Sequence, residues 1–329
     1  MTSFVFPSKL KKGDRVRVIT PSRSLAIITD ETREIATNKF KELGLSIDFG
    51  KHVEESDEFC SSSINSRIED LHQAFADSDI KGIFTVIGGY NSNQLLRYID
   101  WSIIRNNPKI LCGFSDITVL QNAIFTKTGL VTYSGPHYST FAQEHYFDYT
   151  LDCVRKCLFS DKPFMVEPSA EWSDDEWWVD QMHRHLTLNP GWLVINEGEC
   201  SGTVVGGNLG TFSLLFGTEY FPSIKDKILF IEDDLETKFY EFDRRLQSLI
   251  HQPNFDKVKG IVIGRFQLGS EMTNDFLINI IKAKKELAHV PIIANVDFGH
   301  TDPKITWPIG GEAMITVAKK GSKIEFVKH

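Results

Sequence analysis

Apolar runs alternate with amphipathic stretches along the first half of the chain. The pattern predicts strands at residues 15–20 and 82–87, and the second is a continuous apolar run, as expected for a strand buried on both faces. Residues 29–43 and 63–77 carry apolar residues at helical spacing. The same reading predicts strands at 45–49 and 109–112 and helices at 93–99 and 116–127. Such alternation predicts a parallel sheet with right-handed crossovers.

The pattern changes after residue 159. Residues 168–178 are acidic, rich in tryptophan and without a clear period, which predicts a long loop. From residue 201 onward the apolar runs are shorter and separated by glycine-rich turns, with helices predicted at 240–250 and 274–287. We therefore expect an α/β protein with three segments. These are an N-terminal parallel-sheet α/β domain (1–160), a linker with a Trp-rich loop (161–200), and a smaller C-terminal mixed α/β domain of β-rich character (201–329).

Composition narrows the function classes. The chain has 329 residues, 36 Lys and Arg against 44 Asp and Glu, and a net charge of −8 without a long basic run. Binding to a nucleic-acid polymer or an anionic membrane needs clustered positive charge and is disfavoured. The five cysteines form no Cys-x-x-Cys pair, which favours reduced thiols. The first residues lack a basic segment followed by a long apolar one, so we expect a cytoplasmic protein.

The first candidate for chemistry is a strand that runs into a serine turn. Residues 110–112 are apolar, and Gly113-Phe114-Ser115-Asp116 follows, directly before a predicted helix. Such a turn exposes a nucleophilic serine near a helix N-terminus. Ser115 or Asp116 serving only as a helix cap is the alternative. Ile117 stands where the common hydrolase elbow has glycine, which argues against an ordinary α/β-hydrolase.

Three further strand ends carry polar groups. The turn at Gly89 could supply one oxyanion amide and Asp116 another, although a tight turn alone also favours glycine. Glu232 follows an apolar strand and could orient a histidine, or be a solvated strand end. His300 follows another strand and could be the general base, or a bystander. Since functional groups gather at strand ends in α/β sheets, nucleophile, base and acid could converge. His183 and His185 lack a third ligand, so we predict no metal.

The ordered motifs resemble one family. Together they look like the LD-carboxypeptidase family of serine peptidases, from about residue 12 to 315: Gly-Gly-Tyr-Asn (88–91), Gly-Phe-Ser-Asp (113–116), Gly-Gly-Asn-Leu (206–209), Ile-Glu-Asp (231–233), Gly-Arg-Phe (264–266) and Gly-His-Thr-Asp-Pro (299–303). The resemblance implies a Ser–Glu–His triad at Ser115, Glu232 and His300. It also implies an active site between two domains, a homodimer, and no cofactor.

Two branches of that family suggest different substrates. One cleaves the bond between an L- and a D-residue in murein peptides. The other resembles microcin C self-immunity peptidases, which cut the amide between an aminoacyl or peptidyl group and a nucleotide-like moiety. Residues 171–178 look like the base-stacking loop of the second branch, with Trp177 or Trp178 preferred over Trp172; tryptophans packed on the protein body are the alternative.

The acidic loop would repel a phosphate, but a neutral acyl-sulfamate less so. Asn208 matches a position near the substrate and could instead only shape its turn through a left-handed conformation. A small peptide or a peptidyl or aminoacyl nucleotide is therefore the expected substrate. A murein-recycling carboxypeptidase and a non-catalytic two-lobed binding protein are the rival readings.

Overall fold

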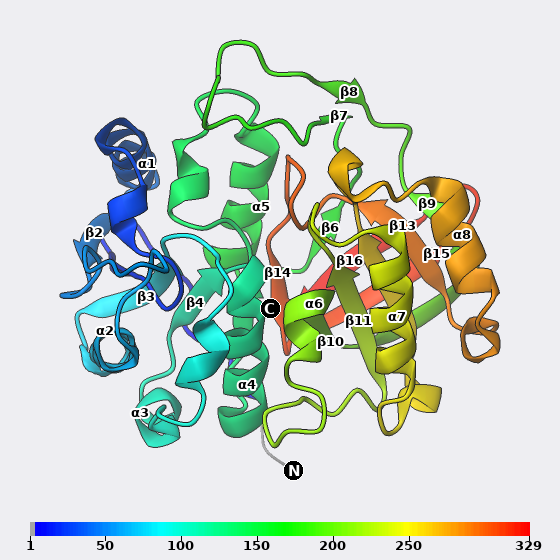
Figure 1. Ribbon diagram of the computed structural model, residues 1–329, viewed down its shortest axis with the longest axis horizontal. Coiled ribbons are helices and arrows are strands. Elements are labelled where there is room, and N and C mark those ends of the chain that lie inside the picture. Colours follow the sequence, from blue (N-terminus) through cyan, green and yellow to red (C-terminus); the bar gives the residue numbers. More distant parts are fainter. Residues whose placement is uncertain (1–3) are drawn as a thin grey trace.

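The computed structural model describes residues 4–329, and two sheets form the halves of the molecule (Figure 1). The N-terminal half lies on the left of the view and the C-terminal half on the right. Of the N-terminal segment on which the cytoplasmic expectation rested, residues 1–3 lie outside the described part. Within residues 4–329 no helix is both long and apolar enough to span a bilayer.

The first sheet has six strands, and its five N-terminal strands are parallel as the sequence predicted. In spatial order they are β14 (Trp307–Ile309), β5 (Thr132–Ser134), β4 (Ile110–Gly113), β3 (Ile80–Thr85), β1 (Arg15–Ile19) and β2 (Ser46–Phe49). Its helices are α1 (Asp30–Glu42), α2 (Ile64–Ala76), α3 (Trp101–Asn106), α4 (Thr118–Thr128) and α5 (Asp148–Leu158).

Local sequence explains where these helices begin. The side chains of Thr29 and Ser63 accept hydrogen bonds from backbone amides in the first turns of α1 and α2, as N-caps do. The helix predicted at 93–99 is wrong: residues Ser92–Leu95 form only a 3-10 turn, and a separate helix, α3, starts after the cap Asp100. Seven residues are too few to show a helical period, whereas a cap residue marks a start directly.

The second sheet has eight strands and mixed direction, which agrees with the predicted β-rich α/β half. Strands β10 to β13 are parallel, and the others pair antiparallel. The spatial order is β6 (Phe164–Val166), β16 (Lys323–Lys328), β15 (Glu312–Val317), β10 (Gly198–Asn208), β11 (Lys227–Glu232), β12 (Gly260–Gly264), β13 (Ile292–Val296) and β9 (Leu193–Asn196). Helices α6 (Leu209–Ser213), α7 (Phe239–Ile250) and α8 (Asn274–Lys282) belong to this half.

The sheets exchange strands across the segment boundaries expected from the sequence. Strands β6 and β9 come from the predicted linker and join the second sheet, whereas β14 comes from the C-terminal segment and pairs with β5 in the first. Between β6 and β9 the chain forms the long green loop at the top of Figure 1, which carries the short strands β7 (Glu171–Trp172) and β8 (Thr187–Leu188). Runs of three or four residues are too short for a period to reveal them.

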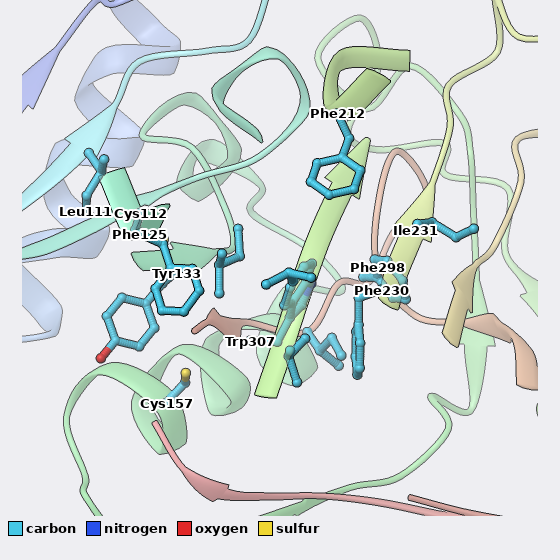
Figure 2. Packing of buried hydrophobic residues seen from close by; sticks show 14 of the residues in the cluster. Leu111, Cys112, Phe125, Tyr133, Cys157, Phe212, Phe230, Ile231, Phe298 and Trp307 are labelled. Carbon is cyan, nitrogen blue, oxygen red and sulfur yellow. The ribbon is translucent and has the colours of Figure 1, made fainter. Parts of the chain in front are cut away.

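Buried aromatic side chains join the two halves (Figure 2). Trp307 belongs to the first sheet through its pairing with Ser134, yet its ring lies 4.9 Å from that of Phe230 on β11 in the second sheet. Phe298 packs against both rings. Large buried rings contribute much of the apolar area removed from water. This cluster therefore fixes one sheet against the other and sets the distance between their strand ends.

Candidate active site

Ser115 lies on a strained turn at the end of β4. Its φ of 59° is in the left-handed region, which is costly for a residue with a side chain and recurs at functional sites. A 3-10 turn, Ser115–Ile117, then leads into α4. Glycines make room for this turn: a Cβ at Gly113 would lie 2.3 Å from Oγ1 of Thr85, and one at Gly88 would lie 3.0 Å from Oγ of Ser115.

Glu232 and His300 come from the second sheet. Glu232 is the last residue of β11 and is buried, while His300 follows the loop after β13. Two glycines bring backbone against the carboxylate: a Cβ at Gly299 (φ +100°) would lie 2.5 Å from Oε2 of Glu232, and one at Gly264 2.7 Å from its Cβ. The tight packing fixes the direction in which the carboxylate points.

The three side chains meet in one hydrogen-bonded chain. Nε2 of His300 lies 3.0 Å from Oγ of Ser115, and Nδ1 lies 2.8 Å from Oε2 of Glu232. Burial lowers the pKa of His300, but the charge and hydrogen bond of Glu232, with a contribution from Asp234, outweigh it and raise the pKa above its ordinary value of 6.5. Such an arrangement can take a proton from the serine and hold the resulting imidazolium.

Two backbone amides flank Ser115. Gly89 lines the cleft, and a Cβ there would lie 2.2 Å from Oγ of Ser22. The carboxylate of Asp116 is buried and accepts hydrogen bonds from Ser22 (2.7 Å) and the amide of Ser92 (2.9 Å), which holds the turn in place. Neither the N–H of Gly89 nor that of Asp116 donates to another group in residues 4–329. Neither amide is therefore committed to another partner, as the predicted role of oxyanion donor requires.

A cleft of about 740 Å³ opens over Ser115 and His300. Trp177 and Trp178 both line it, with rings 5.8 Å apart and nearly perpendicular at 86°. Trp177 is only 8% exposed, whereas Trp178 is 60% exposed. Trp172 does not line this cleft; the guanidinium of Arg265 lies 4.9 Å from its ring. Of the three tryptophans, Trp178 alone combines a place in the cleft with an accessible ring.

Asn208 lies at the end of β10 and is buried outside the lining of the cleft. Its side chain caps α6 by accepting from the amide of Thr211 at 2.9 Å, and it donates to Asp233 at 3.3 Å. The left-handed conformation offered as the alternative is wrong, since φ is −59°. Both ends of its side-chain amide therefore have partners inside the protein. Substrate binding by Asn208 stays a prediction.

Charged residues also line the cleft, and sequence reasoning missed several of them. Lys304 pairs with Asp302, and its Nζ lies 5.4 Å from the ring centre of Phe114. The opposite charge comes from the acidic residues Asp174, Asp175, Asp234 and Glu236. Asp174 and Asp175 belong to the acidic loop that the sequence had marked. Lys304, Asp234 and Glu236 lie in other loops without a period, so no pattern marked them.

His137 was missed as well, although it follows the end of β5 and therefore carries the same strand-end signal that selected Glu232. Within residues 4–329 no three His, Cys, Asp or Glu side chains are grouped so as to hold a metal ion. His183 of the predicted His-x-His pair instead contacts Asp180 at 2.9 Å.

Known proteins match almost all of the chain. Residues 16–135 match the N-terminal domain of LD-carboxypeptidases, and residues 201–315 match the C-terminal domain. YocD of Bacillus subtilis is 51% identical over 99% of this chain and 100% of its own. The crystal structure of an MccF-like protein from Bacillus anthracis is 53% identical, with a TM-score of 0.98 over 99% of this chain and 100% of that chain.

A more distant relative is the microcin C7 self-immunity protein MccF of Escherichia coli, 30% identical over 96% of this chain and 94% of its own. A structure of MccF in complex with glutamyl sulfamoyl guanosine has a TM-score of 0.89 at 27% identity, over 98% of both chains. The matches confirm the two-domain α/β fold and the family resemblance. The chain belongs to the LD-carboxypeptidase family and is a serine peptidase.

Proposed function

We propose that the protein is a serine amidase that cleaves the amide bond between an aminoacyl or peptidyl group and a nucleotide-like moiety, using Ser115, His300 and Glu232. The observation that carries the proposal is the hydrogen-bonded chain from Ser115 through His300 to Glu232, with distances of 3.0 and 2.8 Å. It joins residues 185 and 68 positions apart in the sequence. Only a specific fold brings such groups together at the mouth of a cleft.

In this mechanism His300 removes the proton of Ser115, and Oγ attacks the carbonyl carbon. The amides of Gly89 and Asp116 hold the oxyanion, each contributing on the order of 3 kcal/mol to the transition state. His300 then protonates the leaving nitrogen, and water releases the acyl group by the reverse sequence. Glu232 keeps Nδ1–H of His300 oriented and stabilises the imidazolium.

The ring of Trp178 supports a planar leaving group. Its exposed face borders the cleft that holds Ser115, and an aromatic face stacks on any nucleobase. The acidic residues Asp174, Asp234 and Glu236 on the same cleft disfavour a multiply charged phosphate. A sulfamate linkage, which carries at most one negative charge, fits this environment better. MccF, whose structure is known in complex with glutamyl sulfamoyl guanosine, is a relative whose ligand has this chemistry.

A second candidate is cleavage of the terminal D-alanine of a murein tetrapeptide, the reaction that the family description suggests. Lys304, which lines the cleft, favours it because a carboxypeptidase substrate ends in a carboxylate. The two candidate reactions differ in the leaving group, which is a nucleotide-like group in the first and an amino acid in the second.

The test is incubation of the protein with an aminoacyl-sulfamoyl adenosine and, separately, with a murein tetrapeptide, followed by mass spectrometry of the products. Our proposal predicts release of sulfamoyl adenosine by the wild type and none by Ser115→Ala. Release of D-alanine only would favour the second candidate. Binding of either compound without any cleavage would indicate a non-catalytic protein.

Two further expectations accompany this proposal. The family resemblance implies a homodimer, which light scattering of the purified protein would test. Cytoplasmic location also stays a prediction, which cell fractionation would test.

A further inference from the structure

His137 is a buried histidine beside the nucleophile with one ring nitrogen lacking a partner. The residue is 2% exposed and lines the cleft. Its Nδ1 lies 2.7 Å from Oγ1 of Thr85, whereas Nε2 has no hydrogen-bond partner within the described chain. Most buried polar atoms in proteins are paired, and an exception needs an explanation. Its place in the cleft suggests that a ligand supplies the missing partner.

The hydrogen bond with Thr85 decides which nitrogen carries the proton. Among residues 4–329, the other acceptor recorded for the Thr85 hydroxyl is the carbonyl of Cys112 at 3.5 Å, outside the normal range for O–H···O bonds. Thr85 therefore donates to Nδ1 of His137, and the neutral ring carries its hydrogen on Nε2. Burial lowers the pKa of His137 well below its usual value, and nearby His300 and Lys304 lower it further, so the ring stays neutral.

Nε2 of His137 and Oγ of Ser115 lie close together and line the same cleft. The point where a Cβ on Gly88 would begin lies 3.0 Å from Oγ of Ser115 and 3.6 Å from Nε2 of His137. Glycine at 88 keeps a side chain from crowding these two atoms, so both stay accessible from the cleft. An atom close to the reacting carbonyl would occupy this region, since it must approach Oγ within about 3 Å. Stacking of the His137 ring on Phe114, with centroids 4.4 Å apart, holds the donor in place.

We propose that His137 binds the substrate: its Nε2–H donates a hydrogen bond to a carbonyl or carboxylate oxygen that lies over Gly88 beside Ser115. This role rests on the proposed amidase function and adds a side-chain donor to the two backbone amides. It selects for an acceptor atom at that position. A substrate that presents an N–H group there binds poorly, because two donors then face each other.

The test compares two variants of nearly equal size, His137→Gln and His137→Met. Glutamine keeps an N–H donor near the place of Nε2, and methionine has none. We expect kcat/KM on the cleaved substrate to fall about 10- to 100-fold in His137→Met, as for a hydrogen-bond partner lost in a buried site. His137→Gln should recover most of this loss. His329→Gln replaces another buried histidine, outside the cleft, and should match the wild type.

A second measurement needs no change at residue 137. In ¹⁵N-histidine-labelled Ser115→Ala protein, the nitrogen shifts of His137 report its tautomer. We expect a protonated Nε2 whose signal moves when substrate is added. An unprotonated Nε2, or an Nε2 signal that does not change at saturating substrate, would overturn the inference even if His137→Met failed to fold.

The outcomes separate this inference from the proposed function. Equal activity of folded Gln, Met and wild-type proteins, with Ser115→Ala inactive, would overturn the role of His137 and leave the amidase standing. Wild-type activity of Ser115→Ala would overturn both.

Discussion

Replacing Glu232 by glutamine removes the negative charge behind His300 and keeps the size of the side chain. The carboxylate oxygen lies 2.8 Å from Nδ1 and is buried. With an effective dielectric constant of about 20, Coulomb's law gives about 6 kcal/mol between an imidazolium and a carboxylate at this distance. Each 1.36 kcal/mol is about tenfold in rate. Since glutamine keeps its carbonyl dipole, we expect kcat/KM to fall roughly 10³- to 10⁴-fold, the range of related triads.

The pH profile of kcat/KM gives an independent test of how Glu232 acts on His300. Glu232 raises the pKa of His300, so the acid limb of kcat/KM in the wild type lies above the ordinary 6.5. Loss of the charge lowers that pKa and moves the acid limb to lower pH. Because the pKa of His300 is higher in the folded than in the unfolded protein, protonated His300 stabilises the folded state. This stabilisation is fully present at pH values below the pKa of the unfolded protein, and it is lost as pH rises through the pKa of the folded protein. The stability difference between wild type and Glu232→Gln should therefore shrink with rising pH.

The assay is kcat/KM on an aminoacyl-sulfamoyl adenosine from pH 5 to 9, with thermal unfolding on the same samples. Glu241→Gln on α7 is the matched control, because it removes one carboxylate outside the cleft. It should keep wild-type activity and its acid limb. Wild-type activity of Glu232→Gln, or an acid limb that stays in place or moves to higher pH, would refute the reasoning.

Three substitutions and one chelator treatment test other parts of the site. Gly299→Ala places a Cβ 2.5 Å from Oε2 of Glu232 at a φ of +100°. We therefore expect unfolding measurements to show a loss of more than about 1 kcal/mol and kinetics to show at least a tenfold loss of activity. Wild-type stability and activity would contradict this expectation. Trp178→Ala should raise KM for the nucleotide-like substrate by about 5- to 100-fold without a loss of stability. Trp177→Ala removes a buried ring and should cost about 3 kcal/mol of stability. The reverse pattern would mean that Trp177 binds the substrate and Trp178 stabilises the protein. Treatment with a chelator should leave the rate unchanged, and inactivation that added zinc reverses would contradict a metal-free mechanism.

Strand ends were the most informative sequence signal. Apolar runs ending in Ser115 and Glu232, and one followed by a loop to His300, could be read directly because buried parallel strands have nearly continuous apolar sequence. The parallel order of the first sheet followed from strands alternating with helices. Convergence of the three residues could not be derived from spacing. It depends on packing such as that of Trp307 between the sheets.

Other features depend on tertiary contacts that leave no periodic trace. Strand β14 has three residues and pairs with a strand more than 170 positions earlier. The burial of Trp177 and the exposure of Trp178 differ although the residues are neighbours, since only the fold decides which ring faces the body. Asparagine occurs both in turns and among substrate-binding residues, but in the structure the side chain of Asn208 caps helix α6.

Covalent labelling tests the central claim most directly. A fluorophosphonate reacts preferentially with an activated serine, and peptide mapping locates the adduct. We predict one adduct, on Ser115, with labelling abolished in Ser115→Ala and strongly slowed in His300→Ala. An adduct on another residue, or labelling of Ser115 that is as fast in His300→Ala as in the wild type, would contradict the account.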